Sequence, residues 1–97
     1  MTVYVDDAMI PFRNMRMNHL ISDTTEELLE MVRKIGVKVK WIQYPGQRNR
    51  EHFDICAAKR ILAIRNGAVS LSYRELALMD RDPKTGRLVK RISPGKG

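Results

Sequence analysis

The chain has 97 residues, of which 43% are apolar and 30% are charged, and its formal net charge is +7. This length supports one modest hydrophobic core and excludes a second domain, and no apolar stretch approaches the roughly 20 residues that a membrane span needs. The first residues lack the basic and then apolar pattern of a signal peptide, and a single cysteine excludes an internal disulfide, so we expect a protein of the reducing cytoplasm that has no membrane partner.

The first predicted elements are two strands and a helix. Residues 3–5 and 15–22 contain side chains that favour β-structure, and His19 would lie on a partly apolar face of the second strand. Apolar residues recur at helical spacing over 24–35. This pattern predicts a helix that ends at Gly36, because glycine readily adopts the left-handed cap conformation.

A third strand and a second helix are expected next. Residues 37–42 alternate apolar and basic side chains, which predicts a strand. Its core-facing residues would be Val37, Val39 and Trp41. After a loop at 43–51, Asp54 would cap a helix that runs to Arg65 or Asn66. The residues that mark one face of this helix are Ala58, Ile61, Leu62 and Arg65.

The last predicted elements are short. Residues 68–71 form a predicted strand, and Ser72 stands at capping-box spacing from Glu75 at the start of a short helix. The residues of 82–86 (DPKTG) favour a turn. Beyond this turn the chain either returns as a hairpin strand or continues as a tail.

Strands that alternate with helices predict a small single-domain α/β sandwich. We expect a three- to four-stranded, largely parallel sheet and about three helices. Residues 1–82 would form this domain, and 83–97 would be a basic C-terminal tail or hairpin. Segment 83–97 has five basic residues and no acidic one, which leaves +2 of the net charge for 1–82. Such a basic segment favours contact with nucleic acid or another polyanion, and the alternative is a solvated tail.

The loop between the third predicted strand and the second helix mixes aromatic and arginine side chains, which together can stack on bases and hold phosphates. In this interpretation Arg48 and Arg50 contact phosphate, whereas the alternative leaves them in a solvated turn. The complete set of predicted nucleic-acid-binding residues is Arg48, Arg50, Lys59, Arg60, Lys84, Arg87, Lys90 and Arg91.

Both histidines lie near aspartates at the ends of predicted elements. His19 precedes Asp23, and His52 precedes Asp54. Ligands of open α/β sheets bind beyond the carboxyl ends of the strands, so these four residues are candidate catalytic residues. Asp6, which follows the first strand, is a candidate metal ligand. The alternative is structural, with the later aspartates as helix caps and His19 as a hydrogen-bonded interior histidine.

Several short segments resemble, in the same order, an uncharacterised family, a domain of unknown function found in small phage and bacterial proteins. The matching segments are VYVDD at 3–7, HLISDT at 19–24, Gly36, HFD at 52–54, KR at 59–60 and GAV at 67–69. The resemblance implies an α/β domain in a bacterial host cell and no established activity. The recurring polar positions of the family fall on Asp6, His19, Ser22, Asp23, His52, Asp54 and Arg60. Members often carry tyrosine at the position of Phe53 and histidine at that of Leu29, so a catalytic site that used those groups would be incomplete here.

These observations lead to three functional hypotheses. The first is a phage or prophage accessory protein that binds nucleic acid through the basic tail and the Arg48/Arg50 loop. The second is a phosphoesterase or nuclease that uses the Asp/His cluster with Mg²⁺ or Mn²⁺ as its cofactor. The third is a module that binds a host protein. The sequence leaves the oligomeric state open.

Overall fold

A computed structural model describes residues 2–47 and 49–90, and for Lys90 the backbone alone. The elements in chain order are β1 (Val3–Val5), β2 (Ile10–Phe12), β3 (Met15–Ser22), α1 (Thr25–Ile35), the 3₁₀ helix η1 (Val39–Trp41), β4 (Phe53–Cys56), α2 (Ala57–Arg65), β5 (Val69–Ser70), α3 (Tyr73–Ala77), β6 (Met79–Arg81) and β7 (Leu88–Lys90). No helix within these described residues is long and apolar enough to cross a membrane.

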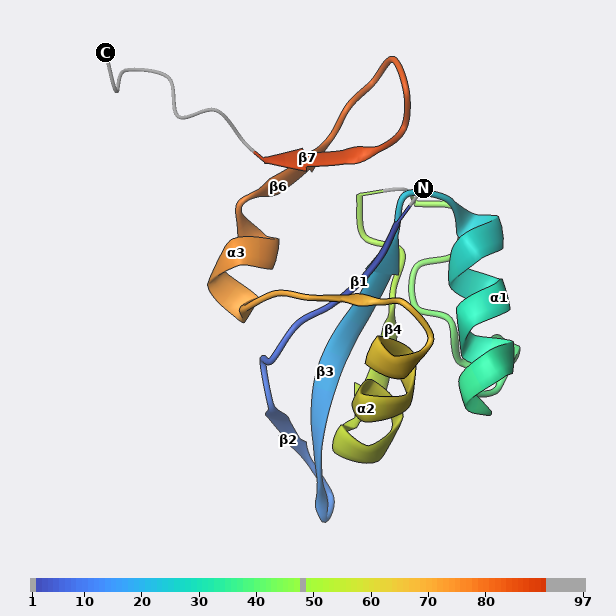
Figure 1. Cartoon of the computed structure of the whole chain (residues 1–97), viewed down its shortest axis with the longest axis vertical. Helices are drawn as coiled ribbons and strands as arrows, with labels where there is room; N and C mark the ends of the chain where they lie inside the picture. Colours follow the sequence, from blue (N-terminus) through green and yellow to red (C-terminus); the bar gives the residue numbers. More distant parts are fainter. Residues whose placement is uncertain (1, 48, 91–97) are drawn as a thin grey trace.

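The α/β class is confirmed, but the expectation of a largely parallel sheet is wrong. The five-stranded sheet is built around β3, which pairs antiparallel with β1, β2 and β4, and only β5 pairs in parallel, with β1. A strand–helix–strand unit normally returns the chain for parallel pairing. Here the segment 37–52 lies between α1 and β4 and carries the chain back along the sheet, so β4 enters in the opposite direction (Figure 1).

The hydrophobic core fills one face of this sheet. Val5, Leu20 and Phe53 are fully buried side chains from three adjacent strands. Helices α1 and α2 cover this face, whereas α3 and the β6–β7 hairpin lie beyond the opposite side of the sheet (Figure 1). Because side chains alternate along a strand, the residues between the core positions project from the other face, which we call the open face.

Helix α1 confirms the predicted start and end. The Thr24 side chain accepts a hydrogen bond from the Glu27 amide, and Gly36 closes the helix with φ 79°. The predicted strand at 68–71 and the capped helix after it are also present, as β5 and α3. Local capping chemistry therefore decided these boundaries.

The strand predicted at 37–42 is absent. The segment forms η1 instead, with Val37 buried but Trp41 56% exposed and Lys38 over its ring at 5.4 Å. Alternation of apolar and basic residues normally indicates a strand. In this chain β4 occupies the neighbouring edge of β3, so the segment serves as a connection rather than as a strand.

Asp54 does not cap a helix. It lies within β4, where Phe53 and Ile55 are buried on the core face, and α2 begins only after Cys56. The predicted helix face is wrong as well. Helix α2 buries Ala63, while Ile61 is 52% and Leu62 36% exposed. The alternation of core residues in β4 prevailed over the capping propensity of aspartate.

Residues 79–90 form the β6–β7 hairpin. Its strands pair antiparallel, with Asp80 opposite Val89, and the Gly86 amide donates to the Asp82 carbonyl at 2.7 Å in the predicted turn. Arg81 attaches the hairpin to the end of β3, because its guanidinium donates to the backbone oxygens of Ser22 and Asp23. The hairpin is thereby held beside the open face.

Candidate metal centre

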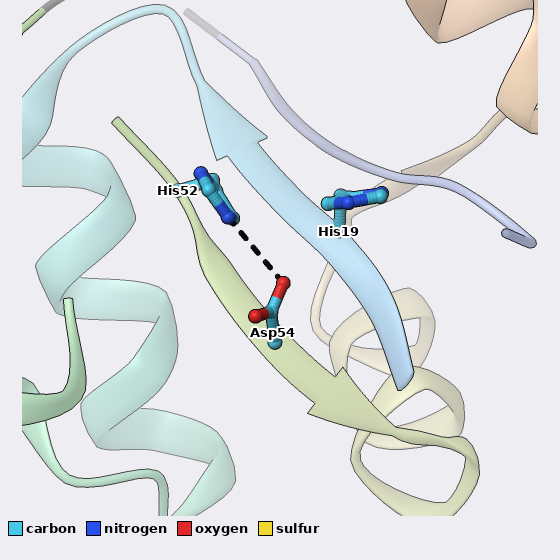
Figure 2. A group of neighbouring side chains, drawn as sticks. All are labelled: His19, His52 and Asp54. Atoms are coloured by element: carbon cyan, nitrogen blue, oxygen red, sulfur yellow. Dashed lines mark ion pairs between the residues drawn. The ribbon is translucent and has the colours of Figure 1, made fainter. Parts of the chain in front are cut away.

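Three potential metal ligands meet on the open face. His19 on β3 and Asp54 on β4 are cross-strand partners, and His52 lies two residues before Asp54. One ligand atom from each of these three residues lies within 4.8 Å of the other two. Figure 2 shows the three side chains on the two neighbouring strands, with His52 directed at Asp54. Two segments that are 33 residues or more apart in the sequence thus form one cluster.

The His19 ring is fixed by Asp6. The Asp6 carboxylate is fully buried, and it accepts a hydrogen bond from His19 Nδ1 at 2.7 Å. It also accepts hydrogen bonds from the backbone amides of His19 at 2.7 Å and Ala8 at 3.2 Å. These contacts place the ring proton on Nδ1 and leave Nε2 as the nitrogen with a free lone pair. Asp6 therefore lies behind His19 rather than within the ligand group.

The His52 ring is fixed in the same way by a different acceptor. Its Nδ1 lies 2.6 Å from the carbonyl oxygen of Arg50, which can only accept, so Nδ1 carries a proton. Its Nε2 lies 3.4 Å from Asp54 Oδ1. Two ligand atoms at about 2.0–2.1 Å from a tetrahedral zinc ion are themselves roughly 3.4 Å apart. The His52–Asp54 spacing therefore suits two ligands of a single metal ion.

The electrostatics of the Asp6–His19 pair follow from its burial. The hydrogen bond to Asp6 raises the pKa of His19 above 6.5, assisted by the charges of Asp6 and Asp54 and opposed by desolvation. Burial by itself would raise the pKa of Asp6, but the hydrogen bonds from His19 and Ala8 outweigh it and hold the pKa below 3.8. The pair is thus charged in the folded protein over a wider pH range than in the unfolded chain.

This pair gives the metal-free protein a defined pH dependence. The contribution of His19 to the free energy of unfolding is complete below its unfolded pKa of 6.5 and is lost as the pH rises through the raised folded pKa. The contribution of Asp6 is complete above its unfolded pKa of 3.8 and is lost as the pH falls through the lowered folded pKa. We expect a His19→Gln variant to lose more stability relative to wild type at about pH 5.5 than at about pH 9. Urea unfolding with EDTA measures this difference, and an equal loss at both pH values would contradict it.

His19 and His52 of the cluster line a cleft of about 610 Å³ between the open face, α3 and the β6–β7 hairpin. The walls of the cleft include Tyr44, which belongs to the aromatic and arginine loop noted in the sequence, and Tyr73, which sequence reasoning missed. Tyr73 stacks on His19 with ring centroids 5.9 Å apart, and Tyr44 lies 6.1 Å from His52. The Arg50 guanidinium stands 4.0 Å over the Tyr44 ring. No local signal marked Tyr73, because only the packing of α3 against the open face brings it to the site.

Asp23 lies away from the cluster. Its buried carboxylate accepts hydrogen bonds from the amides of Thr2 at 2.8 Å and Leu88 at 2.7 Å, and Arg87 Nε is 3.9 Å away. These contacts fasten the N-terminus and the β6–β7 hairpin to the end of β3. Asp23 thus has a structural role, as the alternative interpretation expected. The role is not the predicted helix cap, because Thr24 caps α1.

The predicted nucleic-acid-binding residues do not share one surface. Arg50 lies at the cleft, whereas Arg60 is used internally and donates to the Asp6 carbonyl and to Ser70 Oγ. Lys59 Nζ lies beside Gly36 at the end of α1, 3.1 Å from the position that a Cβ on that glycine would occupy. Lys59 is therefore on the side of the sheet that the helices cover. Lys84 and Arg87 belong to the hairpin connection. Arg48, Arg91 and the side chain of Lys90 lie outside the described residues.

Comparison with known families matches residues 3–82 to a family described as "Protein of unknown function (DUF4031)". This chain belongs to that family. No curated protein and no solved structure matches the chain. The DUF4031 segment contains every residue of the cluster together with Asp6, while β7 lies beyond it. The family description assigns no activity, so the cleft is the feature of this DUF4031 protein that bears on its function.

Proposed function

We propose that this protein is a metal-dependent phosphoesterase whose divalent ion is held by His19, His52 and Asp54. The observation that carries the proposal is the orientation of both histidine rings. Each Nδ1 is engaged by an oxygen acceptor, Asp6 for one ring and the Arg50 carbonyl for the other. Histidines that bind metals almost always donate their second ring N–H to a carboxylate or a carbonyl in this way.

The donor set favours a transition metal. Imidazole nitrogen suits Zn²⁺ and related ions, carboxylate oxygen also suits Mn²⁺, and Mg²⁺ prefers oxygen ligands alone. We therefore place Zn²⁺ or Mn²⁺ ahead of the Mg²⁺ that the sequence also allowed. Three protein ligands are typical of catalytic sites, which keep a coordination position for water or substrate. A site of this kind supplies an activated water at neutral pH.

A phosphate ester would meet Arg50 in the cleft. Arg50 and Arg81 line the cleft together with the acidic residues Glu51 and Asp80. The Arg81 guanidinium is bound to backbone carbonyls, so the argument for a phosphate ester rests on Arg50, whose guanidinium stands over the Tyr44 ring. In the proposed reaction a water oxygen forms a bond to phosphorus and the bond from phosphorus to the ester oxygen breaks. The leaving alkoxide takes up a proton, so a diester and water yield a monoester and an alcohol. The metal and Arg50 would offset the negative charge that develops on the phosphoryl oxygens.

The test combines binding with turnover. Purified protein stripped with EDTA should bind one equivalent of Zn²⁺ or Mn²⁺ in isothermal titration calorimetry. With that ion restored, it should hydrolyse bis(p-nitrophenyl) phosphate, and EDTA should abolish the activity. Failure to bind either ion at micromolar concentration would refute the proposal.

Nucleic-acid binding without catalysis is the second candidate, and it corresponds to the accessory protein expected first from the sequence. The stacked Arg50–Tyr44 pair favours it, because such a pair at an exposed rim can hold a phosphate beside a base. Salt-sensitive binding of DNA or RNA by a protein that binds no metal would select this candidate.

A further inference from the structure

The β2–β3 hairpin projects from the end of the sheet that lies away from the β6–β7 hairpin (Figure 1). The register pairs Ile10 with Met17 and Phe12 with Met15. Since side chains alternate along β3, Met15 and Met17 project from the same face of the strand as His19. The four apolar residues therefore form a strip that leads along the open face to the cluster. We call Ile10, Phe12, Met15 and Met17 the apolar strip.

The apolar strip is exposed and is accompanied by positive charge alone. Ile10 is 47%, Phe12 51% and Met15 42% exposed. The only charged residues between 8 and 18 are Arg13 and Arg16. Side chains alternate along β3, so Arg16 projects from the other face of the sheet and Arg13 is the charge that accompanies the strip. The Arg13 guanidinium lies over the Phe12 ring at 5.4 Å. An apolar platform with an arginine at its tip and no acidic residue matches a partner that offers flat apolar groups and negative charge together.

The turn of this hairpin presents Arg13 in an unusual conformation. Its φ is 56°, in the left-handed region that favours glycine. A two-residue hairpin turn of type II′ needs a positive φ at its first position, so the turn itself accounts for this conformation. Here the conformation sets an arginine at the tip, beside the one aromatic ring of the strip.

We propose that single-stranded nucleic acid is the substrate class, and that it runs from the metal centre along the apolar strip to Phe12 and Arg13. Bases stack on exposed aromatic rings while arginines hold the phosphates, a mode that requires unpaired bases. Met15 lies four positions before His19 along β3, a reach of about 13 Å. The strip would thus contact nucleotides beyond the one at the metal. This inference rests on the proposed phosphoesterase for cleavage, but binding along the strip requires no metal.

The experiment measures binding separately from catalysis. Fluorescence anisotropy in EDTA would follow a labelled oligo(dT) strand of about 12 nucleotides, its abasic counterpart and the matching duplex. Phe12→Ser should weaken oligo(dT) binding about 5-fold or more and should leave the abasic strand nearly unaffected. Arg13→Ala should lower the slope of log affinity against log salt by about 0.7, the value for one phosphate contact on a single strand.

The chain offers a matched control pair. Trp41 is 56% exposed with Lys38 over its ring at 5.4 Å, the same arrangement as Phe12 with Arg13, but it lies on η1 beside α1. Trp41→Ser and Lys38→Ala should leave oligo(dT) binding unchanged. Equal losses in both pairs, tighter binding of the duplex, or wild-type binding by Phe12→Ser would each overturn the inference. If the protein binds oligo(dT) through the strip but hydrolyses no phosphodiester, the proposed activity is overturned and the inference about the strip stands.

Discussion

Replacing His52 with alanine should lower the affinity for Zn²⁺ or Mn²⁺ by at least about 100-fold, since loss of a residue that only supports a metal ligand already costs about 10–100-fold. The variant removes a nitrogen that stands 3.4 Å from Asp54 and leaves two of the three ligands. Hydrolysis of bis(p-nitrophenyl) phosphate should fall with the bound metal. Isothermal titration calorimetry and turnover at a saturating metal concentration measure the two effects.

The fold should tolerate this change. The partly buried His52 side chain makes one hydrogen bond to the backbone, to the Arg50 carbonyl, so we expect a stability loss of about 1 kcal/mol. Asn49→Ala is a suitable control, because Asn49 lines the same cleft and is not a member of the ligand group. A His52→Ala protein that binds metal within threefold of wild type would remove His52 from the site.

Asp6→Asn should reduce metal affinity by about 10–100-fold although Asp6 is not in the ligand group. The reason is the tautomer of His19. Asp6 Oδ1 accepts from two backbone amides, so the amide oxygen of asparagine must take that place and its NH₂ must face His19 Nδ1. Nδ1 then becomes an acceptor, and the ring proton moves to Nε2, the nitrogen needed by the metal.

Nitrogen NMR of the imidazole distinguishes this effect from simple damage. The Asp6→Asn spectrum should show the Nε2–H tautomer of His19 with a stability loss of about 1 kcal/mol, because the hydrogen bonds are retained. Asp6→Ala should cost about 3 kcal/mol, because it leaves buried donors without an acceptor. Asp7→Asn, which alters a neighbouring aspartate bonded to the Tyr73 amide, should change neither readout. An unchanged tautomer in Asp6→Asn would contradict the explanation.

Local sequence signals predicted several elements correctly. The capping chemistry of Thr24 and Gly36 set α1, and the Ser72–Glu75 box set α3. Such signals depend only on groups a few residues apart, so the sequence displays them directly. The predictions of a strand at 37–42 and of a helix cap at Asp54 were wrong. The structure of these segments depends on the pairing of β4 with β3 and on the burial of Phe53, which involve residues far away in the sequence.

For the site, the sequence by itself determined which residues have the chemistry. Two histidines beside aspartates were visible, and His19, His52 and Asp54 were among the candidates. Only the tertiary structure decided that these three converge, that Asp6 orients His19 from behind, and that Asp23 fastens a hairpin instead. The physical reason is that cross-strand register sets which side chains become neighbours. Register is fixed by burial of the whole core face, which no short segment encodes.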